Sequence, residues 1–136
     1  MTKPGEFSPA TVQLIWDRDR GRCAMPGCQS PVLVRERRAE PFGGWSVQHR
    51  EARGRGGVKR NSDRPHLVLP SNGVLLCGTG TTGCHGDVEH HRDNVDPSWG
   101  FTVSRLGVAR PAEVPLFHAT FGWVRLDDAG GWETAA

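Results

Sequence analysis

The fold is decided by the stretch Asn72-Gly-Val-Leu-Leu-Cys-Gly-Thr-Gly-Thr-Thr-Gly-Cys-His-Gly86. It opens with a short apolar run that ends at Cys77, which predicts a buried strand. A turn rich in glycine and threonine follows. The polar residues from Cys84 to about Asp93 then predict a helix that must stop before Pro97. The stretch therefore predicts a strand, a tight turn and a helix, with a cysteine on each side of the turn.

A second pair of cysteines, Cys23 and Cys28, brackets another tight turn nearer the N-terminus. Two such turns supply the four soft ligands of a closed tetrahedral zinc site, because each turn lets both of its sulfurs point at one ion. Four buried thiols acting as small apolar residues and a pair of disulfides are the alternatives. The pairwise spacing and the absence of an apolar signal segment at the start favour zinc, because cytosolic thiols stay reduced. We therefore expect Cys23, Cys28, Cys77 and Cys84 to hold a structural Zn²⁺ ion in a cytoplasmic protein.

The composition explains why such a site would be needed. The chain has 136 residues, of which 36% are hydrophobic, together with 18 Gly and 10 Pro. This composition predicts one domain with many turns and a thin core, to which a structural zinc adds about 10 kcal/mol or more of folding free energy. No run approaches the roughly 18 apolar residues that a membrane-spanning helix needs, so no membrane partner is expected. The net charge of +2 gives no global field that would identify a partner.

The residues before the quoted stretch predict a helix and two strands. Ser8-Pro9 is typical of a helix start, and Val12 and Ile15 follow on one apolar face. Residues 31–35 are predicted to form a short strand. Residues 45–50, Trp-Ser-Val-Gln-His-Arg, alternate between apolar and polar as a half-buried strand does.

Near the C-terminus, two alternating stretches at residues 101–106 and 121–126 predict a β-hairpin. The whole chain is expected to form a single small α+β domain. Its three parts are an N-terminal helix with a zinc knuckle (1–44), a strand–strand–helix core (45–93) and a C-terminal β extension (94–136).

Two histidines and an asparagine lie at the junctions of the predicted core elements. His49 ends the first strand, Asn72 precedes the second, and His85 begins the helix. With these residues in this order, the chain resembles the HNH endonucleases, in particular the small zinc-stapled ones of phages and prophages of actinobacteria. The resemblance is carried by residues 48–57, 72–77, 80–86 and 91–92.

The resemblance implies a ββα-metal (HNH) core and a metal-dependent endonuclease that hydrolyses phosphodiester bonds of DNA. Enzymes of this family nick one strand per active site and leave 5′-phosphate and 3′-hydroxyl ends. A monomer or a homodimer is therefore expected. Phage DNA packaging beside a terminase in the cytoplasm of a bacterial host, homing, and defence are the biological settings that the resemblance implies.

The resemblance also assigns roles to individual residues. His49 would be the general base, since an unperturbed histidine with a pKa of about 6.5 is neutral at pH 7, and activity would fall as pH drops through that pKa. Asn72 would position the loop and orient the base. His85 would hold one catalytic divalent cation, which could be Mg²⁺, Mn²⁺, Ni²⁺ or Zn²⁺. His91 could approach this cation, whereas His90, about 100° around the helix, is expected to face solvent.

One position departs from the family pattern. The family usually places Asp, His or Glu just before the general base as a second metal ligand, and here that residue is Gln48. An amide oxygen is a neutral and weaker ligand than a carboxylate or an imidazole. Gln48 is retained as a candidate ligand, but it supports an alternative function: a non-catalytic, zinc-stabilised DNA-binding module with a degenerate HNH site. A thiol-based redox protein is a third possibility.

The long segment after His49 is locally basic. Residues 50–64 hold six basic and two acidic side chains, a net charge of +4, although the whole chain carries only +2. Such a segment attracts phosphate backbones without reading bases, and the alternative is a solvated charged loop. The expected DNA contacts are Arg50, Arg53, Arg55, Lys59 and Arg60.

Overall fold

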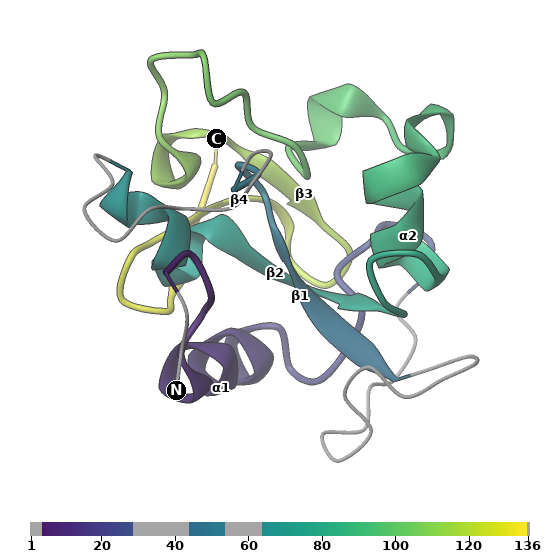
Figure 1. The fold of residues 1–136 in the computed structure, drawn as a ribbon, viewed down its shortest axis with the longest axis horizontal. Coiled ribbons are helices and arrows are strands. Elements are labelled where there is room, and N and C mark those ends of the chain that lie inside the picture. Colours follow the sequence, from purple (N-terminus) through teal and green to yellow (C-terminus); the bar gives the residue numbers. More distant parts are fainter. Residues whose placement is uncertain (1–3, 29–43, 54–63, 136) are drawn as a thin grey trace.

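The computed structural model describes residues 4–28, 44–53 and 64–135 and shows a small mixed domain of helices and two sheets (Figure 1). The predicted α+β class is confirmed at this level. The strand expected at residues 31–35 lies outside the described residues. Among the residues that are described, no helix is long and apolar enough to cross a membrane.

The first helix, α1, spans Pro9–Arg18 and begins where the sequence predicts. The Ser8 hydroxyl accepts a hydrogen bond from the backbone N–H of Thr11 at 3.1 Å, and Pro9 occupies the first helical position. Val12 and Ile15 are buried, so the apolar face predicted from their spacing is the face that packs on the domain.

The centre of the domain is an antiparallel hairpin of β1, Trp45–His49, and β2, Gly73–Cys77. The register pairs Val47 with Leu75. Side chains alternate between the two faces of a hairpin, so the two strands contribute to two separate apolar clusters. Trp45, Val47 and Leu75 pack with the apolar face of α1.

The opposite face of the hairpin packs against α2 and the C-terminal part of the chain. Val74 and Leu76 share a buried cluster with Val88 of α2 and with Leu116 and Val124. The helix α2 spans Gly83–His90, which is shorter than predicted. Figure 1 shows α1 and α2 on different sides of the β1–β2 hairpin.

Several short 3₁₀ helices connect these elements, and most of them begin at a proline, whose fixed φ suits a first helical position. They are η2 Pro65–Val68, η3 Pro70–Asn72, η4 Arg92–Asn94, η5 Pro97–Trp99 and η6 Pro111–Glu113.

The C-terminal extension is a three-stranded antiparallel sheet rather than the predicted hairpin. Its strands are β3 Leu116–His118, β4 Gly122–Leu126 and β5 Trp132–Thr134, in the order β3-β4-β5. The prediction of a strand at residues 101–106 is wrong. Gly100 turns the chain at φ +87°, and Phe101 is buried in the core, so the alternation in that stretch does not reflect a half-buried strand.

A buried polar group ties α1 to both sheets. The Asp19 carboxylate accepts hydrogen bonds from Arg18, from the backbone N–H of Leu75 and from Nε2 of His118 at 3.0 Å. Burial acts to raise the pKa of Asp19, but Arg18 and His118 hold it below its ordinary value. This ion pair fixes the N-terminal helix against strands that lie far away in the sequence.

Candidate active site and metal centre

The four cysteines come together in the structure as predicted. All four sulfurs lie within 4.8 Å of one another, and none forms a disulfide. The sulfurs of Cys28 and Cys77 are 3.8 Å apart. Four sulfurs at about 2.3 Å around a tetrahedral Zn²⁺ ion would be separated by about 3.8 Å, so the donor set fits such an ion.

Hydrogen bonds and electrostatics also suit a cation at this cluster. The backbone N–H of Cys77 donates to the sulfur of Cys23, and that of Cys84 donates to the sulfur of Cys77, both at 3.4 Å. A hydrogen bond to Cys77 raises the pKa of the Cys23 thiol to about 12, and contacts with Cys23 and Cys77 raise that of Cys84. Hydrogen bonds from Cys23 and Cys84 lower the pKa of Cys77, so that without a cation the cluster favours one thiolate among thiols. Four thiolates would coexist only beside a compensating positive charge. The tetrad could hold a metal ion such as zinc, which would tie the N-terminal turn to β2 and α2.

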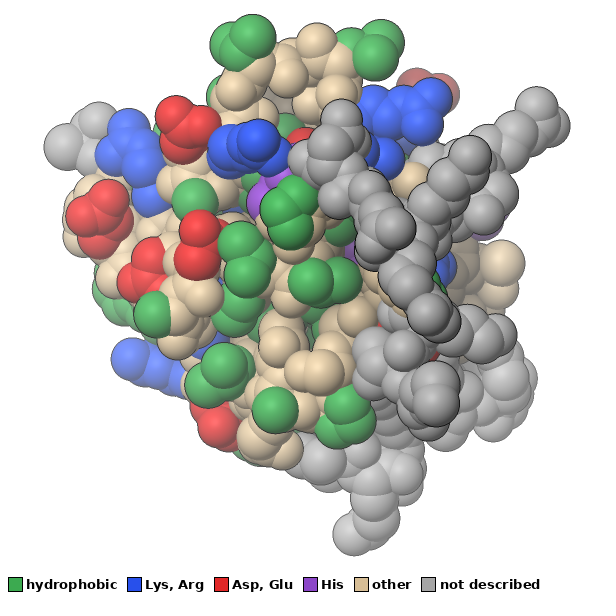
Figure 2. Space-filling view, turned by 60° about the vertical axis from the view of Figure 1, so that its left-hand side comes forward, with side chains coloured by type: hydrophobic (Ala, Val, Ile, Leu, Met, Phe, Trp, Pro, Cys, Tyr) green, Lys and Arg blue, Asp and Glu red, His purple; other side chains and the backbone are tan. Residues whose placement is uncertain are grey.

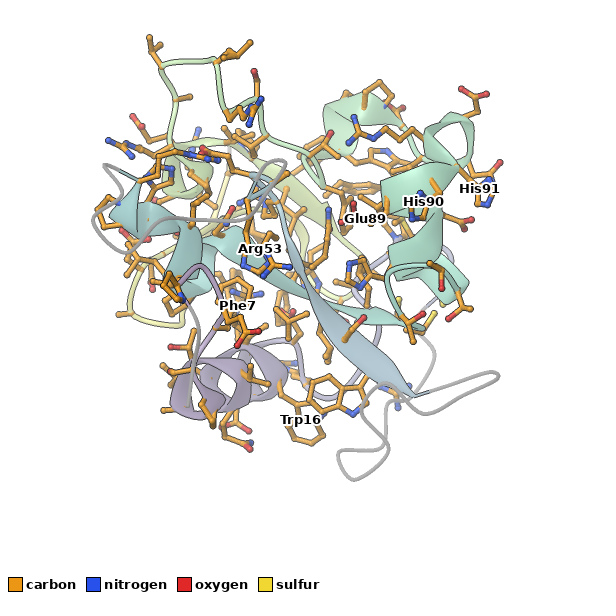
Figure 3. All side chains as sticks on the ribbon, viewed as in Figure 1. Phe7, Trp16, Arg53, Glu89, His90 and His91 are labelled. Atoms are coloured by element: carbon orange, nitrogen blue, oxygen red, sulfur yellow. The ribbon has the colours of Figure 1, made fainter. Side chains whose placement is uncertain are left out.

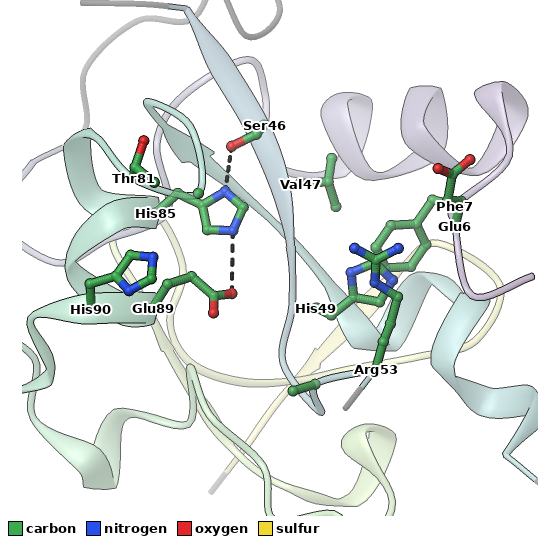
Figure 4. A pocket seen from close by; sticks show the side chains of 12 residues that line it. Glu6, Phe7, Ser46, Val47, His49, Arg53, Thr81, His85, Glu89 and His90 are labelled. Carbon is green, nitrogen blue, oxygen red and sulfur yellow. Dashed lines mark hydrogen bonds and ion pairs between the residues drawn. The ribbon is translucent and has the colours of Figure 1, made fainter. Parts of the chain in front are cut away.

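Separately from the cysteines, a pocket of about 780 Å³ lies beside β1 and contains both predicted catalytic histidines. His49 enters it with Phe7 and Arg53, and His85 enters it from α2 (Figure 4). The sequence prediction that His49 and His85 share one site is consistent with this placement.

A chain of hydrogen bonds determines which ring nitrogen of His85 carries the proton. The Ser46 hydroxyl donates its single proton to the Gly78 carbonyl oxygen at 2.8 Å. Its oxygen therefore accepts from Nδ1 of His85, which lies 2.5 Å away. Nε2 of His85 lies 3.5 Å from a carboxylate oxygen of Glu89. It donates to that carboxylate when the ring is protonated, which holds the pKa of Glu89 below its ordinary value, and it offers a lone pair to a cation when the ring is neutral. An imidazole lone pair and a carboxylate oxygen placed in this way are suitable ligands for one divalent cation.

His49 is held in the opposite tautomer. Its Nε2 lies 2.7 Å from the carbonyl oxygen of Gly5, which can only accept, so Nε2 is protonated and Nδ1 is the basic nitrogen. Burial lowers the pKa of His49 to about 4, opposed by the hydrogen bond to Gly5 and assisted by the nearby Arg53. The expectation that the base titrates near pH 6.5 is corrected accordingly: His49 is neutral down to about pH 5.

Two further residues of α2 line the pocket together with His85. The sequence analysis missed Glu89, whereas His90 is exposed as predicted. His91, which was expected to be able to approach the cation, is an exposed residue at the end of α2 that does not line the pocket (Figure 3). The signal for Glu89 was available, since residues four apart lie on the same face of a helix.

The prediction that Gln48 is a metal ligand is also wrong in this structure. Gln48 is 2% exposed, its Nε2 donates to the Phe101 carbonyl oxygen at 2.8 Å, and it does not line the pocket. Consecutive strand residues point to opposite faces, so Gln48 and the neighbouring His49 are directed apart. The departure from the family pattern at position 48 therefore does not count against a metal site at His85 and Glu89.

Asn72 is buried outside the pocket and holds the start of the long segment. Its Oδ1 accepts from the backbone N–H of Glu51 at 2.7 Å, and its Nδ2 donates to the carbonyl oxygens of Glu51 and Leu67. This arrangement is consistent with the predicted loop-positioning role, and it makes Asn72 a positioning residue rather than a catalytic one.

The prediction that Arg50 contacts DNA is wrong. Its side chain is 1% exposed, and its guanidinium donates to four backbone carbonyl oxygens at 2.9–3.1 Å. These carbonyls belong to Ser71, Gly100, Pro111 and Val114. Arg50 therefore joins distant segments of the fold, and at 1% exposure its guanidinium is not accessible to a phosphate.

Arg53 remains available for DNA, because it is exposed and lines the pocket beside His49. Near it, Arg64 donates to the carbonyl oxygens of Ala52 and Arg53 and to the Glu51 carboxylate. These hydrogen bonds join residues 51–53 to Arg64. The other predicted contacts, Arg55, Lys59 and Arg60, lie outside the described residues. On the face shown in Figure 2, basic and acidic side chains of the described residues are interspersed.

The site thus consists of two histidines, a carboxylate and an arginine around one pocket, with the four-cysteine cluster at the N-terminal end of α2. No protein-family model, curated protein or solved structure matches this chain.

Proposed function

We propose that this protein is a metal-dependent DNA endonuclease of the HNH type. The observation that carries the proposal is the pair of complementary tautomers in one pocket. His49 donates through Nε2 to Gly5, which leaves Nδ1 as its basic nitrogen, and His85 contacts Ser46 through Nδ1, which leaves Nε2 beside the Glu89 carboxylate. A neutral histidine with one free nitrogen is suited to accept a proton, and another beside a carboxylate is suited to hold a cation.

In the proposed reaction, Nδ1 of His49 takes a proton from a water molecule while the water oxygen attacks the phosphorus of a DNA phosphodiester. The new P–O bond forms as the bond to the 3′ oxygen breaks, and that oxygen leaves with a proton from solvent. The products are a 5′-phosphate and a 3′-hydroxyl. Arg53, at the same edge of the pocket as His49, is placed to neutralise a phosphate oxygen.

We assign the catalytic cation to Nε2 of His85 and the carboxylate of Glu89. A divalent ion bound there would stabilise negative charge on the phosphate and on the leaving oxygen. The Ser46 hydroxyl supports this role, because it accepts the Nδ1 proton of His85 and so keeps Nε2 free for the ion. The second proposed ion is a structural Zn²⁺ at Cys23, Cys28, Cys77 and Cys84.

The decisive experiment is nicking of supercoiled plasmid with Mg²⁺, Mn²⁺ or Ni²⁺ by the wild type and three variants. His49→Ala should lower the nicking rate at least a hundredfold, the lower end of a typical general-base contribution. Glu89→Gln should raise the concentration of cation needed for half-maximal rate. His91→Ala is the matched control, because it removes an exposed histidine adjacent to the pocket helix, and it should leave the rate unchanged.

Equal nicking by the wild type and His49→Ala would refute the catalytic assignment. If neither protein nicks but both retard DNA in a gel, the non-catalytic DNA-binding module is the correct function. Metal analysis tests the remaining possibility: about one tightly held zinc per chain, retained in His85→Ala, excludes a redox protein based on these thiols.

A further inference from the structure

The segment of residues 5–7, immediately before α1, contacts the His49 side chain in two ways. The Gly5 carbonyl oxygen accepts the hydrogen bond from Nε2 at 2.7 Å. The ring of Phe7 stacks on the imidazole with 4.2 Å between centroids and an angle of 21° between planes. Both contacts join residues more than 40 positions apart, and Figure 4 shows Phe7 beside His49 at the edge of the pocket.

The position of His49 on β1 does not by itself determine where its basic nitrogen lies. The strand fixes the backbone, but the second side-chain torsion of histidine is broad and roughly two-fold. Turning the ring by about 180° would put a carbon where Nδ1 now faces the pocket. The Gly5 carbonyl favours one of these orientations because it requires an N–H opposite it, and the stacked phenyl ring restrains the plane of the imidazole.

The segment is itself well anchored. Phe7 is 8% exposed and belongs to the buried cluster that includes Val12 of α1. Phe7 precedes the Ser8 cap and Val12 is the fourth helical residue, which are the two positions that a hydrophobic staple joins at a helix start. Gly5 has φ +84°, a conformation that glycine adopts without steric cost. The cap of α1 therefore fixes where the carbonyl of Gly5 is placed.

We propose that Gly5 and Phe7 are positioning residues of the active site, which select the tautomer and the ring orientation of His49. This inference rests on the proposed function for its effect on rate, but the effect on the imidazole is independent of activity. If Gly5 and Phe7 position His49, the N-terminal segment belongs to the active site. Outside this segment, the residues that line the pocket all lie between positions 46 and 90.

Two variants of the full chain test the proposal. Phe7→Leu keeps an apolar side chain in the staple but removes the flat ring. Gly5→Pro requires a φ near −65°, so it displaces the carbonyl from Nε2. The matched control is Leu75→Val, which loosens the same buried cluster from β2 and leaves the staple of Phe7 and Val12 in place.

The first measurement is the imidazole ¹⁵N spectrum of His49, assigned by comparison with His49→Gln. The wild type and Leu75→Val should show protonated Nε2 and bare Nδ1, whereas Phe7→Leu and Gly5→Pro should show mixed tautomers. The second measurement is plasmid nicking with Mn²⁺. The two test variants should lose about tenfold to a hundredfold in kcat, with KM for DNA unchanged.

The proposal is overturned if His49 keeps the Nε2–H tautomer in both test variants. It is also overturned if Leu75→Val mixes the tautomers as strongly as Phe7→Leu, because the spectrum would then report only loosening of the cluster. If the wild type does not nick DNA at all, the proposed function fails, yet the ¹⁵N spectra still decide whether Gly5 and Phe7 orient His49.

Discussion

Arg50 allows a quantitative prediction, because the structure assigns it to the fold whereas the basic segment around it suggests a role in DNA binding. Replacing it by methionine removes four hydrogen bonds to carbonyl oxygens, of which that of Val114 is partly buried and that of Pro111 keeps the backbone N–H of Val114 as a second donor. At about 1–2 kcal/mol for each hydrogen bond lost, this costs about 4–8 kcal/mol. The substitution also removes a buried charge, and burying that charge is unfavourable, since burial lowers the pKa of Arg50 to about 9. Its removal therefore offsets part of the lost stability. We expect Arg50→Met to lower the free energy of unfolding by about 3–5 kcal/mol.

The assay is chemical and thermal unfolding followed by circular dichroism, with zinc held constant. A loss of this size lowers Tm by about 10–20 °C for a domain of this length. Arg53→Met is the matched control: it should change Tm by no more than about 2 °C and weaken DNA binding instead, because Arg53 is exposed at the pocket. The reasoning is refuted if Arg50→Met unfolds like the wild type and loses DNA affinity.

Three further predictions follow from the site. In an NMR titration His49 should protonate with a midpoint near pH 4, and a midpoint above 6 would contradict the burial argument. Because the unfolded chain binds this proton at a higher pH than the folded chain, the contribution of His49 to stability should decline as pH falls from about 6.5 through 4. Removing the metal with a strong chelator, or replacing Cys77 by serine, should unfold much of the domain, since a structural zinc contributes about 10 kcal/mol or more; unchanged circular dichroism after verified zinc loss would contradict this. Gln48→Asp should lower stability by about 2–4 kcal/mol, because it buries a carboxylate and removes the donor to the Phe101 carbonyl; higher nicking at low cation concentration would instead place residue 48 at the metal.

Sequence reasoning succeeded where the determining interactions are local. The start of α1 depends on Ser8 and Pro9, which act within one helical turn. The strands β1 and β2 are recognisable from their own apolar residues. The cysteine pairs each bracket a short turn, so only the meeting of the two turns had to be inferred.

It failed where a side chain is committed to partners far away in the sequence. The carbonyls bound by Arg50 are 21 to 64 residues away, and nothing near Arg50 in the sequence indicates them. The burial that shifts the pKa of His49 likewise depends on the distant residues Gly5 and Phe7. Glu89 is a different case, because its spacing of four residues from His85 places both side chains on one face of a helix and is readable from the sequence.

The two apolar clusters lie on opposite faces of the β1–β2 hairpin, and each supports a different histidine of the proposed active site. His49 depends on the cluster that contains Phe7, whereas His85 is carried by α2, which packs with the cluster around the cysteines. The proton acceptor and the cation ligand therefore have separate structural supports that meet only across the pocket. A substitution that loosens one cluster but leaves the hairpin folded would therefore disturb one of the two proposed roles before the other.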